Sequence, residues 1–123
     1  MKIEREQAEG RNLFTGYGEG YVEVNRTRHS QSLVVSAERV VTEWPARSVD
    51  ELAADHLAAI LELDPEIVLL GSGATFRFPD PARLAPLREA RVGVEVMDTP
   101  AACRTYNILL AEGRQVVAAL ILP

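Results

Sequence analysis

The chain has 123 residues, a length that suits one domain with its own hydrophobic core, so we expect residues 1–123 to form a single domain. Apolar residues make up 47% and charged residues 25%, as in globular proteins, and the net charge of -5 disfavours nucleic acid and anionic lipid as partners. A single cysteine, no signal-peptide pattern and no apolar run of about 20 residues predict a cytoplasmic protein that does not insert into a membrane.

The first third of the chain predicts short strands. Residues 1–11 are polar and mixed in charge, which indicates a loosely held segment. Apolar stretches at 21–24, 32–35 and 39–42 are separated by polar turns. This pattern predicts an N-terminal antiparallel meander.

The middle of the chain predicts a helix followed by a buried strand. Ser48 and Glu51 have the spacing of a capping box, so we expect a helix to begin there and to end before Asp64-Pro65. The continuous apolar run at 67–70 then predicts a strand that is covered on both faces. The buried stripe of the helix would consist of Ala53, Leu57, Ile60 and Leu61.

The last third alternates helix and strand. Asp80-Pro81 begins a second helix, which Pro86 should shorten, and a strand is expected at 92–96. Thr99 would be the N-cap of a third helix, which precedes a last buried strand at 116–122. Strands that alternate with helices predict an α/β fold with a largely parallel central sheet and helices on its faces.

Glycines after the first parallel strand could bind an anion. Gly71 and Gly73 allow a tight turn that presents backbone N–H groups, and Ser72 adds a hydroxyl donor. Thr75 and Arg77 follow with further donors. The alternative is a plain turn, which we favour because the loop lacks the Lys-Ser/Thr pair of a phosphate-binding P-loop.

Glu95 lies near the carboxyl end of a strand otherwise built from apolar residues, where a buried carboxylate would need a partner. Arg104, one turn into the third helix, could pair with it and leave the N–H groups from Thr99 onward free for an anion. Glu95 would then be a general base or a ligand anchor. Alternatively, the pair would be a structural clamp between strand and helix, which we favour.

Two further groups of residues could face a ligand or a partner. Arg104 and Asn107 share a helix face that could line the pocket or contact a partner chain. Phe76 and Phe78 flank Arg77 and would anchor a protein partner if exposed, or plug the end of the sheet if buried. No spacing of His or Cys residues predicts a metal site, and no cofactor is indicated.

Three segments of the chain resemble a known family: LLGSGATFRFP, VGVEVMDTPAACRTYNILLAEGR and VVAALILP. The family consists of small bacterial and archaeal domains of unknown function, and its mitochondrial relatives include assembly factor three of respiratory complex I. The resemblance runs from about Thr15 to the C-terminus. It implies a three-layer α/β arrangement with a mixed central sheet, and it implies no catalytic residue or cofactor.

These observations leave two classes of function open. The first is a non-enzymatic interaction or assembly-type module, which binds a protein partner or forms a homodimer. The second is a protein or enzyme that binds a small molecule or anion between the 71–73 loop and the start of the third helix. We favour the first, since no motif in the chain specifies a reaction.

Overall fold

The computed structural model describes residues 10–122, which form eight strands, three α-helices and two 3-10 turns. The strands are β1 (Phe14–Gly18), β2 (Tyr21–Val24), β3 (Thr27–His29), β4 (Leu33–Val35), β5 (Val40–Val41), β6 (Ile67–Gly71), β7 (Gly93–Met97) and β8 (Val116–Leu120). The helical elements are η1 (Val49–Glu51), α2 (Ala54–Leu61), η2 (Pro81–Leu84), α3 (Ala85–Glu89) and α4 (Thr99–Ala111).

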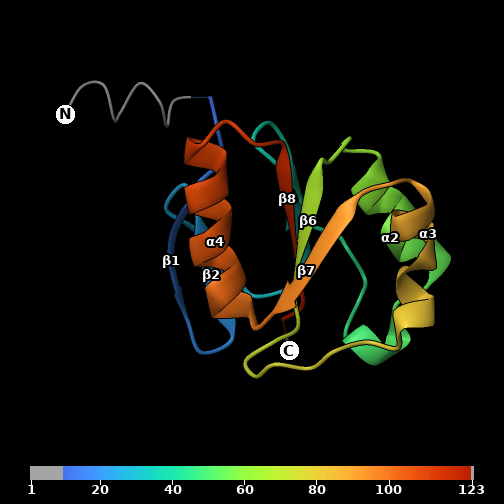
Figure 1. Ribbon diagram of the computed structural model, residues 1–123. Helices are drawn as coiled ribbons and strands as arrows, with labels where there is room; N and C mark the ends of the chain where they lie inside the picture. The colour runs from blue at the N-terminus through green and yellow to red at the C-terminus, as the bar shows by residue number, and fades with distance from the viewer. Residues whose placement is uncertain (1–9, 123) are drawn as a thin grey trace.

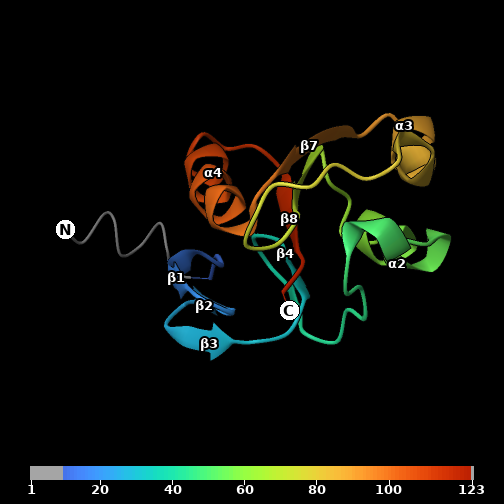
Figure 2. The same ribbon diagram turned by 90° about the horizontal axis from the view of Figure 1, so that it is seen from below.

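These elements form three layers (Figures 1 and 2). The middle layer is a five-stranded sheet with the order β5-β4-β8-β6-β7. Helices α2 and α3 cover one face, while α4 and the three-stranded sheet β1-β2-β3 lie on the other (Figure 2). Strand β6 runs parallel to β7 and β8, and β4 runs antiparallel to β8. The predicted three-layer α/β fold with a mixed central sheet is therefore confirmed.

The central strands are buried on both faces. In β8, Val116, Ala118 and Leu120 belong to the core beneath α4, whereas Val117 and Ala119 belong to the core beneath α2 and α3. Successive side chains of a strand point to opposite faces, so a strand covered on both sides needs apolar residues at every position. This explains why the run at 116–122 shows no alternation.

The predicted meander is divided between the two sheets. Residues 21–24 form β2, which pairs with β1 and β3 in the small sheet. The two later stretches form β4 and β5, a hairpin that extends the central sheet. Asn25 and Arg26 join β2 to β3 with positive φ angles of 50° and 69°, as a two-residue hairpin turn requires. Of the segment predicted to be loose, residues 1–9 lie outside the described residues, and the Arg11 guanidinium donates to the Leu110 carbonyl at 3.0 Å.

The helix predicted to begin at Ser48 starts later in the chain. The Ser48 hydroxyl accepts from the Asp50 N–H at 3.0 Å and caps only the short turn η1. Leu52 then takes an extended backbone conformation and buries its side chain, which interrupts helical geometry before α2. Ala53 is therefore exposed at the N-cap of α2, not part of the buried stripe. The stripe is kept by Leu57 and Ile60.

Candidate functional site

The ends of β6 and β8 meet the start of α4 at one tightly packed junction. A Cβ added to Gly71 would lie 2.8 Å from the Leu120 side chain and 3.0 Å from the Thr99 backbone, so only glycine fits there. Thr99 is buried, and its N–H donates to the Gly73 carbonyl at 2.8 Å. Its hydroxyl accepts from the Gly73 N–H at 2.9 Å and donates to the Ile121 carbonyl at 3.0 Å. Thr99 thus ties together the loop after β6, the start of α4 and the chain after β8.

The polar groups of the 71–73 loop are used within the protein. The Ser72 N–H donates to the Met97 carbonyl at 2.8 Å. The Ser72 hydroxyl donates to the Thr75 carbonyl at 2.8 Å and accepts from the Arg77 N–H at 2.9 Å. The donors at Ser72 and Gly73 that were predicted for an anion are therefore engaged. The loop is a hydrogen-bonded turn, and an anion could bind to these groups only by displacing existing bonds.

The N-cap of α4 is Asp98, one residue before the predicted Thr99. The Asp98 carboxylate accepts from the Ala101 N–H at 2.8 Å. A carboxylate at this end of a helix already occupies the position that the helix dipole offers to an anion. Pro100 adds no N–H group. A second anion at this terminus would meet like charge.

Glu95 and Arg104 do not form the predicted ion pair. Strand β7 is an edge strand, so Glu95 is exposed to solvent and needs no buried partner. Arg104 donates instead to the Tyr17 hydroxyl at 2.7 Å, with its guanidinium carbon 5.7 Å from the ring centroid. The hydrogen bond to Tyr17 is the main reason that the pKa of Arg104 is raised. The predicted clamp between strand and helix is therefore wrong. Within residues 10–122 the ion pairs are Arg77–Asp50 and Arg114–Glu66.

Asn107 attaches the small sheet to α4. Its side-chain oxygen accepts from the Phe14 N–H at 3.0 Å, and its amide nitrogen donates to the Phe14 carbonyl at 2.8 Å. The Asn107 amide thus forms with Phe14 the two hydrogen bonds that a neighbouring strand would form, at a position where the β1–β2 pairing is irregular. The preceding residue, buried Tyr106, donates to the Asn12 carbonyl at 2.9 Å and packs edge-on against the Phe14 ring. Asn107 was predicted to line a pocket, but both of its amide groups serve this attachment.

Cys103 is a core residue of α4. It is buried among the side chains between α4 and the central sheet. Burial raises the pKa of the Cys103 thiol from 9.0 to about 12. The thiolate is the reactive form of cysteine, so this side chain has no nucleophilic character at neutral pH.

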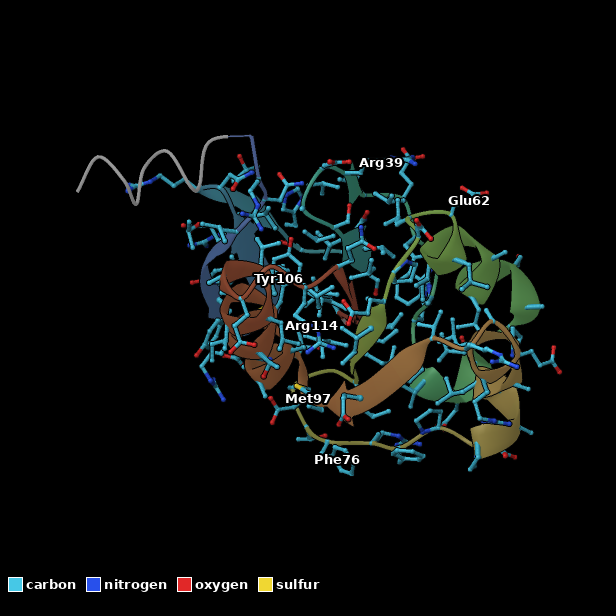
Figure 3. The ribbon with its side chains drawn as sticks, turned by 45° about the horizontal axis from the view of Figure 1, so that its top comes forward. Arg39, Glu62, Phe76, Met97, Tyr106 and Arg114 are labelled. Carbon is cyan, nitrogen blue, oxygen red and sulfur yellow. The ribbon has the colours of Figure 1, made fainter. Side chains whose placement is uncertain are left out.

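Phe76, Arg77 and Phe78 lie on the loop between β6 and η2, at the end of the sheet where β7 joins α4. Figure 3 shows Phe76 pointing away from the body of the protein, with Met97 above it at the end of β7. The Phe76 and Phe78 side chains are 59% and 57% exposed, and their ring centroids are 6.4 Å apart. The rings therefore do not plug the end of the sheet.

A cavity of ≈ 360 Å³ lies between the β1–β2 turn and the start of α4. Thr99, one of the residues predicted for a pocket, lines it, whereas the wall formed by the β1–β2 turn was not predicted from the sequence. Glycines alternate with tyrosines in this turn, and the Tyr21 ring packs so closely on Gly18 that a Cβ there would lie 2.4 Å from it. This alternation is the signal in the sequence that could have located the cavity. Its walls are mostly apolar and include Tyr17, Tyr21, Pro100 and Leu122.

Comparison with known proteins identifies the family of this chain. Residues 14–121 match the family described as "Protein of unknown function (DUF498/DUF598)". The chain belongs to this family. A crystal structure of a Bordetella parapertussis protein is 43% identical and superimposes with a TM-score of 0.86, covering 93% of this chain and 98% of that one. The resemblance inferred from the three sequence segments is thus confirmed.

Two of the relatives differ in what their names say. The "13 kDa major membrane protein" of Francisella tularensis is 28% identical over 98% of this chain and 99% of that protein. The bovine "NADH dehydrogenase [ubiquinone] 1 alpha subcomplex assembly factor 3" is 35% identical over 76% of this chain, which spans only 58% of the bovine protein. In the described part of the chain no helix has the length and apolar character needed to cross a membrane. In the same residues no group of three His, Cys, Asp or Glu side chains could hold a metal ion.

Proposed function

We propose that this chain is a non-enzymatic protein-interaction domain of the assembly type, and that Phe76, Arg77 and Phe78 contact its partner. The observation that carries the proposal is the exposed pair of phenylalanine rings. Large aromatic side chains and arginine contribute most of the binding energy in many protein interfaces. Two apolar rings that are more than half exposed and lie side by side form a patch of the kind that marks a protein-interaction site.

The loop that carries the rings is held in place before any partner binds. The Ser72 hydroxyl is bonded at both ends of a short turn, to the Thr75 carbonyl and the Arg77 N–H. The Arg77 guanidinium forms an ion pair with Asp50, and Pro79 is buried directly after the second ring. A loop that is already ordered loses little conformational entropy on binding. This order favours recognition of a partner by the loop.

The names of relatives support the same class of function. The bovine relative is named as an assembly factor, and an assembly factor acts on other proteins. The proposal also places this chain in the cytoplasm. Because the Francisella relative is named as a membrane protein, cell fractionation is needed to test this location separately.

Affinity capture with in-cell crosslinking tests the proposal. The tagged full chain should capture a defined set of proteins, and the double variant Phe76→Ser/Phe78→Ser should lose them. Both side chains are exposed, so the variant should keep its fold and change the free energy of unfolding by less than about 0.5 kcal/mol.

Ile108→Ser is the matched control. Ile108 is also 59% exposed but lies on α4, so this variant removes the same kind of apolar surface from another element. The control should capture the same proteins as the unaltered chain. Capture that is unchanged in the loop variant would refute the proposed contact, and capture lost only in the control would place it on α4.

A further inference from the structure

Strand β7 forms an open edge of the central sheet. The opposite edge, β5, has only two residues, and the outer side of β1 is covered at Phe14 by the Asn107 amide. By contrast, β7 has five residues and pairs only with β6. Short or covered edges are the usual protection against pairing with another chain. Strand β7 lacks this protection.

The hydrogen bonds of β7 show which backbone groups are free. The Gly93 N–H donates to the Glu66 carbonyl at 3.2 Å, and the Met97 carbonyl accepts from the Ser72 N–H at 2.8 Å. In a parallel strand both backbone groups of alternate residues point to the same neighbour, so Gly93, Glu95 and Met97 face β6. The N–H and C=O groups of Val94 and Val96 therefore point outward. Within residues 10–122 they have no hydrogen-bond partner from another loop or side chain.

The side chains of β7 indicate what could pair there. Val94 and Val96 are half-buried against the core beneath α2 and α3, so an added strand could extend that apolar face. Glu95 points to the other face and is exposed. If two copies of β7 paired antiparallel through Val94 and Val96, the two Glu95 carboxylates would lie directly opposite each other, and like charges in that position are destabilising. Glu95 thus disfavours a second copy and favours a basic residue.

We propose that the outer edge of β7 binds an extended segment of a partner protein with the pattern apolar–basic–apolar. The segment adds a strand to the sheet through the free groups of Val94 and Val96, and its Lys or Arg faces Glu95. This mode of binding combines backbone hydrogen bonds, which give affinity, with one charged position, which gives specificity. The proposal rests on the proposed function and names the chemistry of the partner. The edge adjoins the loop that carries Phe76, since that loop begins where Ser72 is bonded to Met97.

The probe is a synthetic peptide, acetyl-Thr-Val-Lys-Val-Lys-Val-Thr-amide, titrated into the ¹⁵N-labelled full chain to about 2 mM, a range that covers weak binding. The expected result is a change in the amide resonances of Val94 and Val96 and slower hydrogen exchange at both. A peptide with Glu in place of Lys should bind about fivefold or more weakly. A peptide N-methylated at the alternate amides that would face β7 cannot form these hydrogen bonds and should not bind.

Charge reversal supplies the matched pair of variants. Glu95→Lys should reverse the preference between the two peptides, whereas Glu112→Lys, the same change of charge at the exposed end of α4, should leave it unaltered. The inference is overturned if the Lys peptide does not bind, if it perturbs residues away from β7, or if it binds no better than the Glu peptide. A dimer of the full chain in sedimentation experiments that the Lys peptide dissociates would show a second copy as the occupant of this edge and also overturn it. The proposed function would survive each of these results if the Phe76→Ser/Phe78→Ser variant still lost its captured proteins.

Discussion

Replacement of Asn107 by alanine should destabilise the protein by about 2–3 kcal/mol. The change removes two hydrogen bonds, at 3.0 and 2.8 Å, and leaves the N–H and carbonyl groups of buried Phe14 without partners. An unsatisfied buried polar group costs about 1–3 kcal/mol, so the two costs would add to about 2–6 kcal/mol if water were fully excluded. Asn107 itself is only half-buried, so water can replace part of what is lost.

Chemical denaturation measures this change in the free energy of unfolding. A loss of this size should lower the melting temperature by about 8–12 °C for a domain of this length. Hydrogen exchange should accelerate first in β1, β2 and β3, because Asn107 bonds to β1 alone. Ile108→Ala, at the exposed neighbouring position, is the control and should stay within about 0.5 kcal/mol of the unaltered protein. An Asn107→Ala variant as stable as this control would refute the role of the side chain in attaching the small sheet.

Three other predictions follow from the packing at the junction and in the core. Gly71→Ala should lower the free energy of unfolding by about 1–3 kcal/mol, because the added methyl group overpacks the junction. Gly93→Ala should be close to neutral, since the nearest atom to an added Cβ there is 3.7 Å away. Chemical denaturation of the two variants measures the difference. Burial raises the pKa of the Cys103 thiol from 9.0 to about 12. The contribution of this thiol to the free energy of unfolding is therefore complete below pH 9. Above pH 9 the thiol ionises in the unfolded chain first, so this contribution falls by at most about 1.4 kcal/mol per pH unit. Unfolding measured between pH 9 and 10 should show this slope, and Cys103→Ala should remove it. Inorganic phosphate should not raise the melting temperature, since the donors at Ser72 and Thr99 are engaged; a rise that depends on Arg104 would instead support the predicted anion site.

The buried strands and the long helix could be predicted because their local sequence reflects their whole environment. Strands β6 and β8 are covered on both faces, so every position is apolar and the run is unmistakable. Helix α4 keeps the predicted Thr99 start within one residue, because a carboxylate or a hydroxyl can serve as the cap. The local sequence pattern therefore predicts an element correctly where burial on both faces or a helix cap determines which residues the element needs.

The neighbours of each strand could not be predicted in the same way. Glu95 was expected to be buried because its strand is otherwise apolar, yet the strand order places β7 at the edge. Strand order depends on contacts between segments far apart in the chain, which no local pattern records. The same limit applies to Arg104 and Asn107, which were expected to share a helix face. The sequence could not show that this face meets Tyr17 and Phe14, residues 87 and 93 positions away.

The residues that carry the family resemblance fall into two groups with different physical roles. Gly71, Thr99 and Asn107 make close contacts that hold the loop after β6, α4 and the small sheet together, so the fold alone accounts for them. Phe76 and Phe78 belong to the same matching segments, but their side chains are more than half exposed and take no part in these contacts. A side chain that folding does not require is the better candidate for binding. The search for a partner should therefore begin at the 76–78 loop and the adjoining edge of β7, not at the glycine turn.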